Sequence, residues 1–172
     1  VGNVGSYQFV AADGTYLSTY DYSWNGQPAG YSDDPADTVN YISKHDNEAL
    51  WDQLQYGLPS DMALQDRVRI QNVALSIPML SQGIPFLHMG SELIRSKSMD
   101  RNTYDAGDWF NKVDFTKTTN TWNIGLPLAQ DNEAKWGEIS SVSANTNSQF
   151  GPKDIQLTSS LFKEFLNIRS TS

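Results

Sequence analysis

A strand–helix–strand pattern over residues 39–89 sets the strongest limit on how this chain can fold. Residues 39–44 carry β-branched and aromatic side chains, follow the turn Asp33-Asp34-Pro35, and predict a strand. Residues 84–89 predict a second, buried strand. Residues 61–82 predict a helix, because apolar side chains recur there at spacings of three to five: Leu64, Val68, Val73, Ile77 and Leu80. This order forms a crossover, which makes the two strands parallel neighbours or near neighbours.

The ends of the predicted helix carry their own signals. Asp61 has the side chain of an N-cap, and Gly83 stands where a left-handed residue often follows a helix. Pro78 falls in the last turn, where we expect it to kink or loosen the helix.

The rest of the chain is predicted to be less regular. Residues 1–38 read as an irregular lead-in, with a hairpin of residues 7–10 and 15–17 around Asp13-Gly14 and a loop at 24–31. Residues 90–156 show almost no periodicity and predict a long loop excursion. Residues 157–169 predict an amphipathic helix whose apolar face consists of Leu157, Leu161, Phe162, Phe165, Leu166 and Ile168.

These elements are too few to make a complete layered domain. A parallel sheet is normally buried on both faces, and two strands with two helices cannot provide that cover. We therefore predict an α/β fold class and expect residues 1–172 to be a piece of a larger domain, or to fold only against another chain.

The composition excludes several kinds of protein. The net charge of −8 argues against nucleic acid or an anionic membrane as a partner. With no cysteine and two histidines, disulfides are excluded and a zinc site is disfavoured. No run has the length of a membrane span, and the first residues do not resemble a signal peptide, so we expect any export signal to lie outside this chain. Motifs for phosphate loops, hydrolase triads and zinc proteases are absent from the sequence.

Polar side chains follow each predicted strand. His45, Asp46 and Asn47 come after the first strand, and Glu92 follows the second. One interpretation makes Asp46 and Glu92 the two carboxylates of a retaining glycosidase, which lie about 5 Å apart. The alternative is that His45 and Asp46 merely close a strand and cap a turn. His88 lies inside an apolar run and reads as a satisfied core histidine rather than a ligand.

Residues 100–111 gather carboxylates, amides and rings within twelve positions. Calcium binding, a sugar subsite and a solvated loop are the alternatives, and the spacing lacks the glycine that an EF-hand calcium loop requires. Arg95 and Lys97, just before this stretch, are cations that can bind hydroxyls or, more commonly, form ion pairs. The aromatic content of 12% suits stacking on sugar rings, or equally the anchoring of long loops.

Five stretches together resemble the C-terminal part of the catalytic barrel of bacterial pullulanases, which are starch-debranching members of the α-amylase family. The stretches are Val39-Asn-Tyr-Ile-Ser-Lys-His-Asp-Asn47, Gly83-Ile-Pro-Phe, Gly90-Ser-Glu-Leu-Ile-Arg-Ser-Lys-Ser98, Tyr104-Asp-Ala-Gly-Asp-Trp-Phe-Asn111 and Asn123-Ile-Gly-Leu-Pro127. The resemblance runs from about Gly26 to the last helix and is loose between residues 128 and 156.

The resemblance implies a (β/α)8 TIM barrel in which residues 39–46 form the seventh strand and 84–89 the eighth. The whole chain, 1–172, is then the C-terminal segment of one catalytic domain. Asp46 takes the place of the acidic residue that stabilises the transition state, and His45 hydrogen-bonds the same sugar. The family's nucleophile and general acid belong to earlier strands, and no position here matches them, so Glu92 is not the catalytic acid.

Further roles are implied by the same resemblance. Asn47 is expected in the subsite of His45, while Asp105, Asp108, Trp109 and Asn111 are expected to bind neighbouring glucose units. Arg95 and Glu92 are expected to order the loop.

The implied activity is the retaining hydrolysis of α-1,6-glucosidic branch linkages in pullulan and starch-derived dextrins, with this segment inactive alone. One alternative is a non-catalytic carbohydrate-binding or scaffold module derived from such a barrel, and another is an α-1,4-acting relative. The expected partners are the α-glucan substrate and the remainder of the same enzyme. No cofactor is expected for this segment, calcium is allowed in the full enzyme, and the resemblance implies a secreted or cell-surface bacterial protein.

Overall fold

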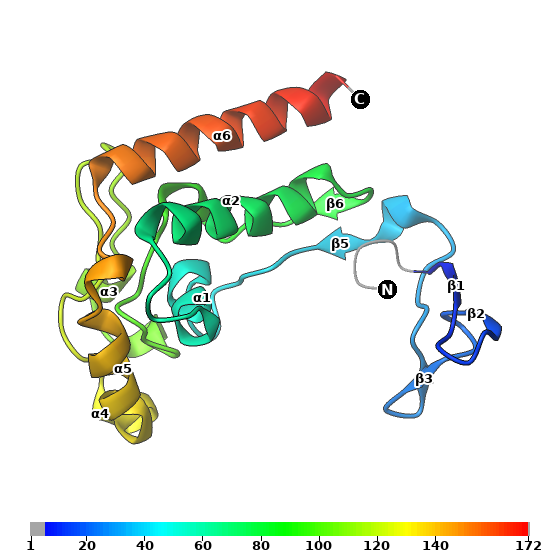
Figure 1. Ribbon diagram of the computed structural model, residues 1–172, viewed down its shortest axis with the longest axis horizontal. Coiled ribbons are helices and arrows are strands. Elements are labelled where there is room, and N and C mark those ends of the chain that lie inside the picture. The colour runs from blue at the N-terminus through cyan, green and yellow to red at the C-terminus, as the bar shows by residue number, and fades with distance from the viewer. Residues whose placement is uncertain (1–5, 172) are drawn as a thin grey trace. The chain divides into compact units, whose positions relative to one another are not determined.

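Figure 1 shows the computed structural model, which describes residues 6–171, the side chain of Asp105 excepted. The chain divides into two compact units. Unit 1 comprises Val1–Tyr41 and Ile77–Phe86, and unit 2 comprises Ile42–Ser76 and Leu87–Ser172.

The described residues of unit 1, 6–41 and 77–86, contain three two-stranded sheets. Strands β1 (Gln8–Val10) and β2 (Tyr16–Ser18) form the antiparallel hairpin predicted from Asp13-Gly14. Strands β3 (Ser23–Trp24) and β4 (Gln27–Pro28) form a second hairpin where a loop was predicted. Both residues between them, Asn25 and Gly26, have positive φ, which is the requirement of a tight two-residue turn, so Asn-Gly was an overlooked hairpin signal.

The third sheet confirms the predicted parallel pair but shortens it. Strand β5 (Val39–Asn40) pairs with β6 (Ile84–Pro85) in parallel register. The prediction of strands over 39–44 and 84–89 was wrong in length, because each strand has one neighbour and Pro85 lacks a backbone donor. Gly83 precedes β6 with a φ of +91°, and a Cβ there would collide with the backbone of Pro35 and with Thr38.

Two helices lie between β5 and β6, where one was predicted. The unpredicted helix α1 (Leu50–Gly57) lies where we expected only a connection, although Leu50, Trp51 and Leu54 have helical spacing. Helix α2 (Leu64–Leu80) confirms the predicted helix and contains Pro78 before its end. The prediction of Asp61 as its N-cap was wrong, because the first helical hydrogen bonds go to the carbonyl of Ala63. A short 3₁₀ turn, η1 (Pro35–Asp37), precedes β5.

Short helical elements interrupt the stretch 90–156 that was predicted as a loop excursion. Its 3₁₀ turns are η2 (Ser91–Leu93), η3 (Thr103–Asp105), η4 (Glu133–Lys135) and η5 (Thr146–Ser148). Its helices are α3 (Asp108–Asn111), α4 (Ala129–Asn132) and α5 (Trp136–Ser143). These pieces are too short for their apolar periodicity to be visible in the sequence.

The last helix, α6 (Pro152–Thr171), confirms the predicted helix and is longer than predicted. Its buried residues are Ile155, Thr158 and Ser159, and it lies alongside α2, where Asn72 Nδ2 donates to Thr158 Oγ1 at 3.2 Å. The predicted apolar face is only partly used, since Leu157, Leu166 and Ile168 are exposed.

Unit 2 encloses a hydrophobic core. Trp51 lies at its centre, edge-on to Trp122 at 6.3 Å and to Phe150 at 4.8 Å between ring centroids. The core cluster consists of Trp51, Val68, Leu93, Ile94, Met99, Trp122, Ile139, Phe150 and Ile155. Several of these come from the polar stretch 90–156, so the apolar residues scattered there act as anchors of the loops.

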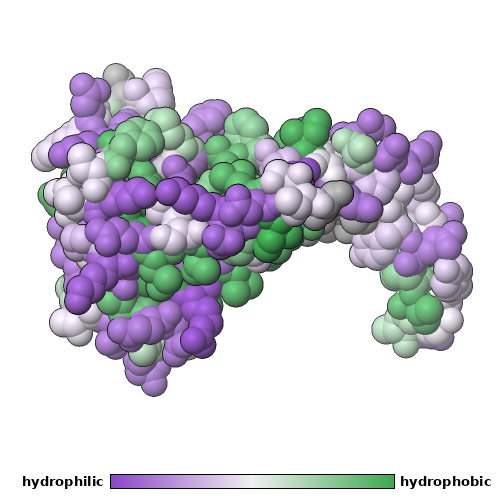
Figure 2. All heavy atoms as spheres, turned by 90° about the horizontal axis from the view of Figure 1, so that it is seen from above, coloured by the Kyte–Doolittle hydropathy of each residue, from purple (hydrophilic) through white to green (hydrophobic). Residues whose placement is uncertain are grey.

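Apolar side chains also reach the surface. Figure 2 shows hydrophobic atoms interspersed with hydrophilic ones on one face of the molecule. In unit 1 the strand residues Val39 and Ile84, with the adjoining Phe86, are each about half exposed. Among residues 6–171, no helix is long and apolar enough to cross a membrane.

Candidate functional site

The candidate site is built around a turn formed by His45, Asp46 and Asn47 in unit 2. The prediction that these residues directly end the strand was wrong, because β5 stops at Asn40 and irregular backbone follows. Asn47 has a φ of +61°, a left-handed conformation that Asn tolerates better than most residues. Helix α1 begins at Leu50, shortly after the turn.

The Asp46 carboxylate lies at the surface between two basic side chains. Lys44 Nζ is 2.5 Å from Oδ2, and His45 Nε2 is 3.3 Å from Oδ1. The hydrogen bond from Lys44, followed by the charges of His45, Lys44 and Lys97, lowers the pKa of Asp46. Asp46 is therefore a carboxylate at neutral pH, which can accept hydrogen bonds or stabilise positive charge but cannot donate a proton.

Asp46 and His45 line a hollow of about 440 Å³ in unit 2. The opposite wall brings together side chains from residues 88–97 and 102–111. Of the residues predicted from the sequence, Arg95 and Asn111 join His45 and Asp46 in this lining. The lining also contains three residues that were not predicted to be there: His88, Lys97 and Tyr104.

His88 was predicted to lie inside a strand, but β6 ends at Pro85. It lines the hollow instead, where its ring is hydrogen-bonded. Arg95 Nη1 lies 3.0 Å from His88 Nε2, and since a guanidinium only donates, Nε2 is the acceptor. The proton of the neutral ring is then on Nδ1, which faces Ser43 Oγ at 3.5 Å. Burial, and then the charge of Arg95, lowers the pKa of His88 to about 4, so this ring is neutral at physiological pH.

Arg95 connects the two segments that wall the hollow. Besides His88, its guanidinium donates to the carbonyl of Met89 and to the carbonyl and Oδ1 of Asn111. Glu92 Oε2 accepts from the backbone N–H of Gly90 at 3.1 Å, within the turn that leads into this segment. Arg95 and Glu92 thus form hydrogen bonds to the backbone of this loop, and their predicted role of ordering it stays a prediction.

Asn111 uses its amide inside the protein. Nδ2 donates to the carbonyl of Thr103 at 2.8 Å, and Oδ1 accepts from Thr103 Oγ1 at 3.0 Å and from Arg95. The side chain therefore braces two segments of the wall, and its predicted contact with glucose stays a prediction.

The other predicted substrate residues lie outside the lining of the hollow. Asp108 opens α3 and is exposed, and Asn47 is exposed on the turn. Trp109 is 60% exposed, packs on Phe110 and donates its Nε1–H to the carbonyl of Ala106. The side chain of Asp105 lies outside the described part of the chain.

Lys97 holds the turn from beneath. Its ammonium donates to the carbonyl oxygens of His45 at 3.2 Å and Asn47 at 2.5 Å. Among the described side chains neither Lys97 nor Arg95 forms an ion pair, which differs from the pairing we expected for these cations. No sequence signal pointed to this role, since a buried lysine cannot be distinguished from an exposed one by its neighbours in the chain.

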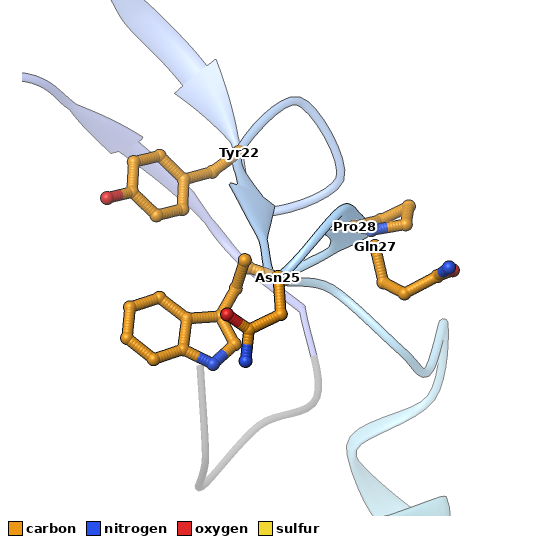
Figure 3. Close-up of a pocket in the computed structure, with 6 residues that line it drawn as sticks. Tyr22, Asn25, Gln27 and Pro28 are labelled. Carbon is orange, nitrogen blue, oxygen red and sulfur yellow. The ribbon is translucent and has the colours of Figure 1, made fainter.

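A second hollow lies on the β3–β4 hairpin of unit 1 and is lined by Tyr22, Trp24, Asn25, Gln27, Pro28 and Ala29. Figure 3 shows Tyr22 and Gln27 pointing away from each other, so the polar atoms there do not converge on one point. A binding site normally combines an apolar surface with convergent polar groups, and this hollow is the weaker candidate.

Metal binding has little support from the described residues. Within 6–171, no three His, Cys, Asp or Glu side chains gather in a way that could hold a metal ion. The described side chains of residues 100–111 therefore provide no set of ligands for calcium.

Comparisons with known proteins give this geometry its context. A family model described as "Alpha-1,6-glucosidases, pullulanase-type, C-terminal" matches residues 117–172. Pullulanase from Klebsiella pneumoniae is 38% identical over 171 residues, which cover 99% of this chain and 16% of that protein. Chloroplastic pullulanase 1 from Arabidopsis thaliana is 42% identical over 147 residues, which cover 84% of this chain and 15% of that relative.

Solved structures agree with these relatives. The crystal structure of PulA from Klebsiella oxytoca matches 99% of this chain and 16% of its own length with a TM-score of 0.91 and 38% identity. A maltotriose complex of PulA from Klebsiella pneumoniae matches 99% of this chain and 18% of its own length with a TM-score of 0.89 and 38% identity. The chain is thus homologous to a segment of pullulanases and spans about a sixth of the length of the Klebsiella protein.

The family model corrects one boundary. The resemblance implied that the whole chain belongs to the catalytic barrel, whereas residues 117–172 match the C-terminal region of pullulanase-type enzymes. Helices α4, α5 and α6 all lie within this matched part.

Proposed function

We propose that this chain is the segment of a pullulanase-type glycoside hydrolase that brings Asp46 to the active site. The enzyme cleaves α-1,6-glucosidic branch linkages of pullulan and starch-derived dextrins with retention. The observation that carries the proposal is the hollow around an ionised Asp46 with His45 beside it, in a chain 38% identical over 99% of its length to Klebsiella pneumoniae pullulanase.

Asp46 stabilises the transition state in this proposal. A retaining glycosidase passes through a transition state with oxocarbenium character, so positive charge develops on the sugar ring. A carboxylate whose pKa is lowered is ionised at neutral pH, and its oxygens can accept hydrogen bonds from sugar hydroxyls. The two roles that require attack and protonation belong to carboxyl groups outside this chain.

The same proposal assigns the parallel pair β5–β6 to the seventh and eighth strands of a (β/α)8 barrel. Its support is the exposure of Val39, Ile84 and Phe86, because the strands of a complete parallel sheet are covered on both faces. The chain then runs out of the barrel into the C-terminal region matched by residues 117–172.

Further polar and aromatic groups serve as sugar contacts in this proposal. His45, with a side chain 82% exposed, hydrogen-bonds the sugar held by Asp46, and Asn47 lies in the same subsite. Trp109, with Asp108 and Asp105 on the neighbouring segment, contacts adjacent glucose units by stacking and hydrogen bonding.

The test is a debranching assay on the full-length protein that carries this chain. Release of reducing ends from pullulan should fall by at least about a hundredfold in Asp46→Asn, because a neutral amide cannot stabilise the developing charge, while pullulan binding is retained. The matched control is Asp66→Asn, an exposed carboxylate on α2 that pairs with Arg69, and it should keep full activity.

The products and the parent protein separate the alternatives. Maltotriose from pullulan supports α-1,6 cleavage, and panose supports an α-1,4-acting relative. Binding without turnover by the unaltered full-length protein supports a non-catalytic module and overturns the proposal.

The proposal also places the enzyme outside the cell or at its surface, where polymeric glucans are accessible. Bacterial pullulanases are among the relatives, and the Arabidopsis relative is chloroplastic, so relatives occur in more than one compartment. Debranching activity in the culture medium or on intact cells of the source supports this placement, and activity confined to lysed cells contradicts it.

A further inference from the structure

Lys97 is the most buried cation next to the candidate site. The residue is 1% exposed, although it contributes to the lining of the hollow. Its ammonium donates to the carbonyl oxygens of His45 and Asn47, which are the residues on either side of Asp46. One side chain therefore fixes the backbone on both sides of Asp46.

The backbone of Lys97 is itself fixed. Its N–H donates to Asp52 Oδ2 at 2.7 Å, and the N–H of Met99 donates to the same oxygen at 3.1 Å. Asp52 is fully buried on α1, the helix that follows the turn of residues 45–47. The turn, α1, Asp52 and Lys97 thus form a closed ring of contacts.

Burying an ammonium group is unfavourable unless hydrogen bonds and nearby negative charge replace its water. Burial lowers the pKa of Lys97, and the carboxylates of Asp52 and Asp100 oppose that lowering. With almost no exposed surface and with its donors directed at backbone carbonyls, Lys97 is better suited to holding the turn than to binding a sugar hydroxyl.

We propose that Lys97 is a positioning residue for Asp46, which holds the turn of residues 45–47 so that Asp46 keeps its place in the lining of the hollow. This inference rests on the proposed function of Asp46. It adds a residue that acts through Asp46 without touching the substrate.

The first test is Lys97→Met in the full-length protein, assayed on pullulan. We expect kcat to fall roughly 10- to 100-fold while KM changes less than about threefold, because small misplacement of a group that acts in the transition state costs rate more than binding. Lys97→Arg retains a donor group and should recover part of kcat. Lys97→Gln, which is polar and too short for both carbonyls, replaces Lys97→Met if that variant does not fold.

A structural role alone would lower stability without a specific effect on kcat. Ile139→Ala removes core volume in α5, away from the hollow, and serves as the control for lost stability. All variants are assayed well below their melting temperatures, where Ile139→Ala should keep the parent kcat.

Combining each Lys97 variant with Asp46→Asn decides the question. If Lys97 acts through Asp46, replacing Lys97 should lower the residual activity of Asp46→Asn by less than about threefold. Additive losses, or a kcat within about threefold of the parent in Lys97→Met or Lys97→Gln, overturn the role of Lys97 and leave Asp46 intact. An Asp46→Asn variant with full activity instead overturns the proposed function.

Discussion

The two units of this chain differ in how completely they bury their apolar side chains. Unit 2 buries Trp51, Trp122 and Phe150 in a core to which helices and loops both contribute. In the described part of unit 1, Met79 is the one buried hydrophobic residue, while Val39, Ile84 and Phe86 around the parallel pair remain about half exposed. A surface of this kind usually marks an interface. Unit 2 therefore carries its own stabilising core, whereas unit 1 leaves the apolar side chains around its parallel pair uncovered.

The largest effect should come from removing the centre of the unit 2 core. Trp51→Ala deletes the ring that contacts Trp122 and Phe150 and leaves a cavity, so we expect it to lower the free energy of unfolding by about 3–5 kcal/mol. Trp109→Ala, at an exposed tryptophan of the same unit, should change it by less than about 1 kcal/mol. Chemical denaturation of the 172-residue chain measures both, and equal losses would contradict the assignment of the core.

The unit 1 surface should respond differently in the chain and in the longer protein. Phe86→Ala should cost less than about 1 kcal/mol in the 172-residue chain, because the ring is half exposed and touches Tyr41 edge-on. If the remainder of a barrel covers this face, the same change should cost about 3 kcal/mol in the full-length protein. Equal and small losses in both proteins would mean that the face stays uncovered.

Asp52 should make the stability of unit 2 depend on pH. Burial raises the pKa of this carboxyl to about 6, against hydrogen bonds from Ser96 and from the N–H groups of Lys97 and Met99. Because the folded-state pKa lies above the unfolded value of about 3.9, the stabilising contribution is complete below about pH 4 and is lost as the pH rises through about 6. Asp52→Asn does not titrate, so its stability relative to the parent should increase by up to about 3 kcal/mol between about pH 4 and pH 7. Denaturation curves of the parent and of Asp52→Asn across this range test the sign.

The smallest effect should be local to one loop of unit 2. The carboxylate of Asp114 accepts hydrogen bonds from the backbone N–H and hydroxyl groups of Thr116, Thr118 and Thr119. The bonds from Thr116 and Thr119 lower its pKa. In Asp114→Ala the amide protons of these threonines should exchange faster with solvent while the melting temperature is unchanged. Hydrogen exchange read by NMR checks this, and unchanged exchange at all three positions would contradict the role of Asp114.

Sequence patterns predicted the elements that carry a local signal. The hairpin at Asp13-Gly14, the parallel pair and the helices α2 and α6 are indicated by turn residues and by apolar spacing. Helix α1 was missed because it is eight residues long and lies next to turn residues. The core of unit 2 was missed because Met99, Trp122 and Phe150 come from loops, where burial follows no period.

The candidate site was predictable only in part. His45 and Asp46 were found because they form a polar group after a strand-like run, and the structure brings both into one hollow with Arg95 and Asn111. The role of Lys97 was not predictable, since it depends on contacts between segments about fifty residues apart, such as Lys97 with Asn47. The role of His88 depends on side-chain contacts with Arg95 and Ser43 that the apolar run around it does not indicate. Such contacts leave no mark in the local sequence.

The contact between Asp52 and the backbone of residues 97 and 99 also restricts how the length of this region can change. Asp52 lies five positions after Asn47, and each residue added to a helix rotates the downstream side chains by about 100°. A single insertion within the first turn of α1 would therefore swing the carboxylate away from the two amides that donate to it and detach Lys97 from its support. Engineering that grafts or trims loops in this protein should leave the span from 47 to 52 at its present length and make its changes elsewhere.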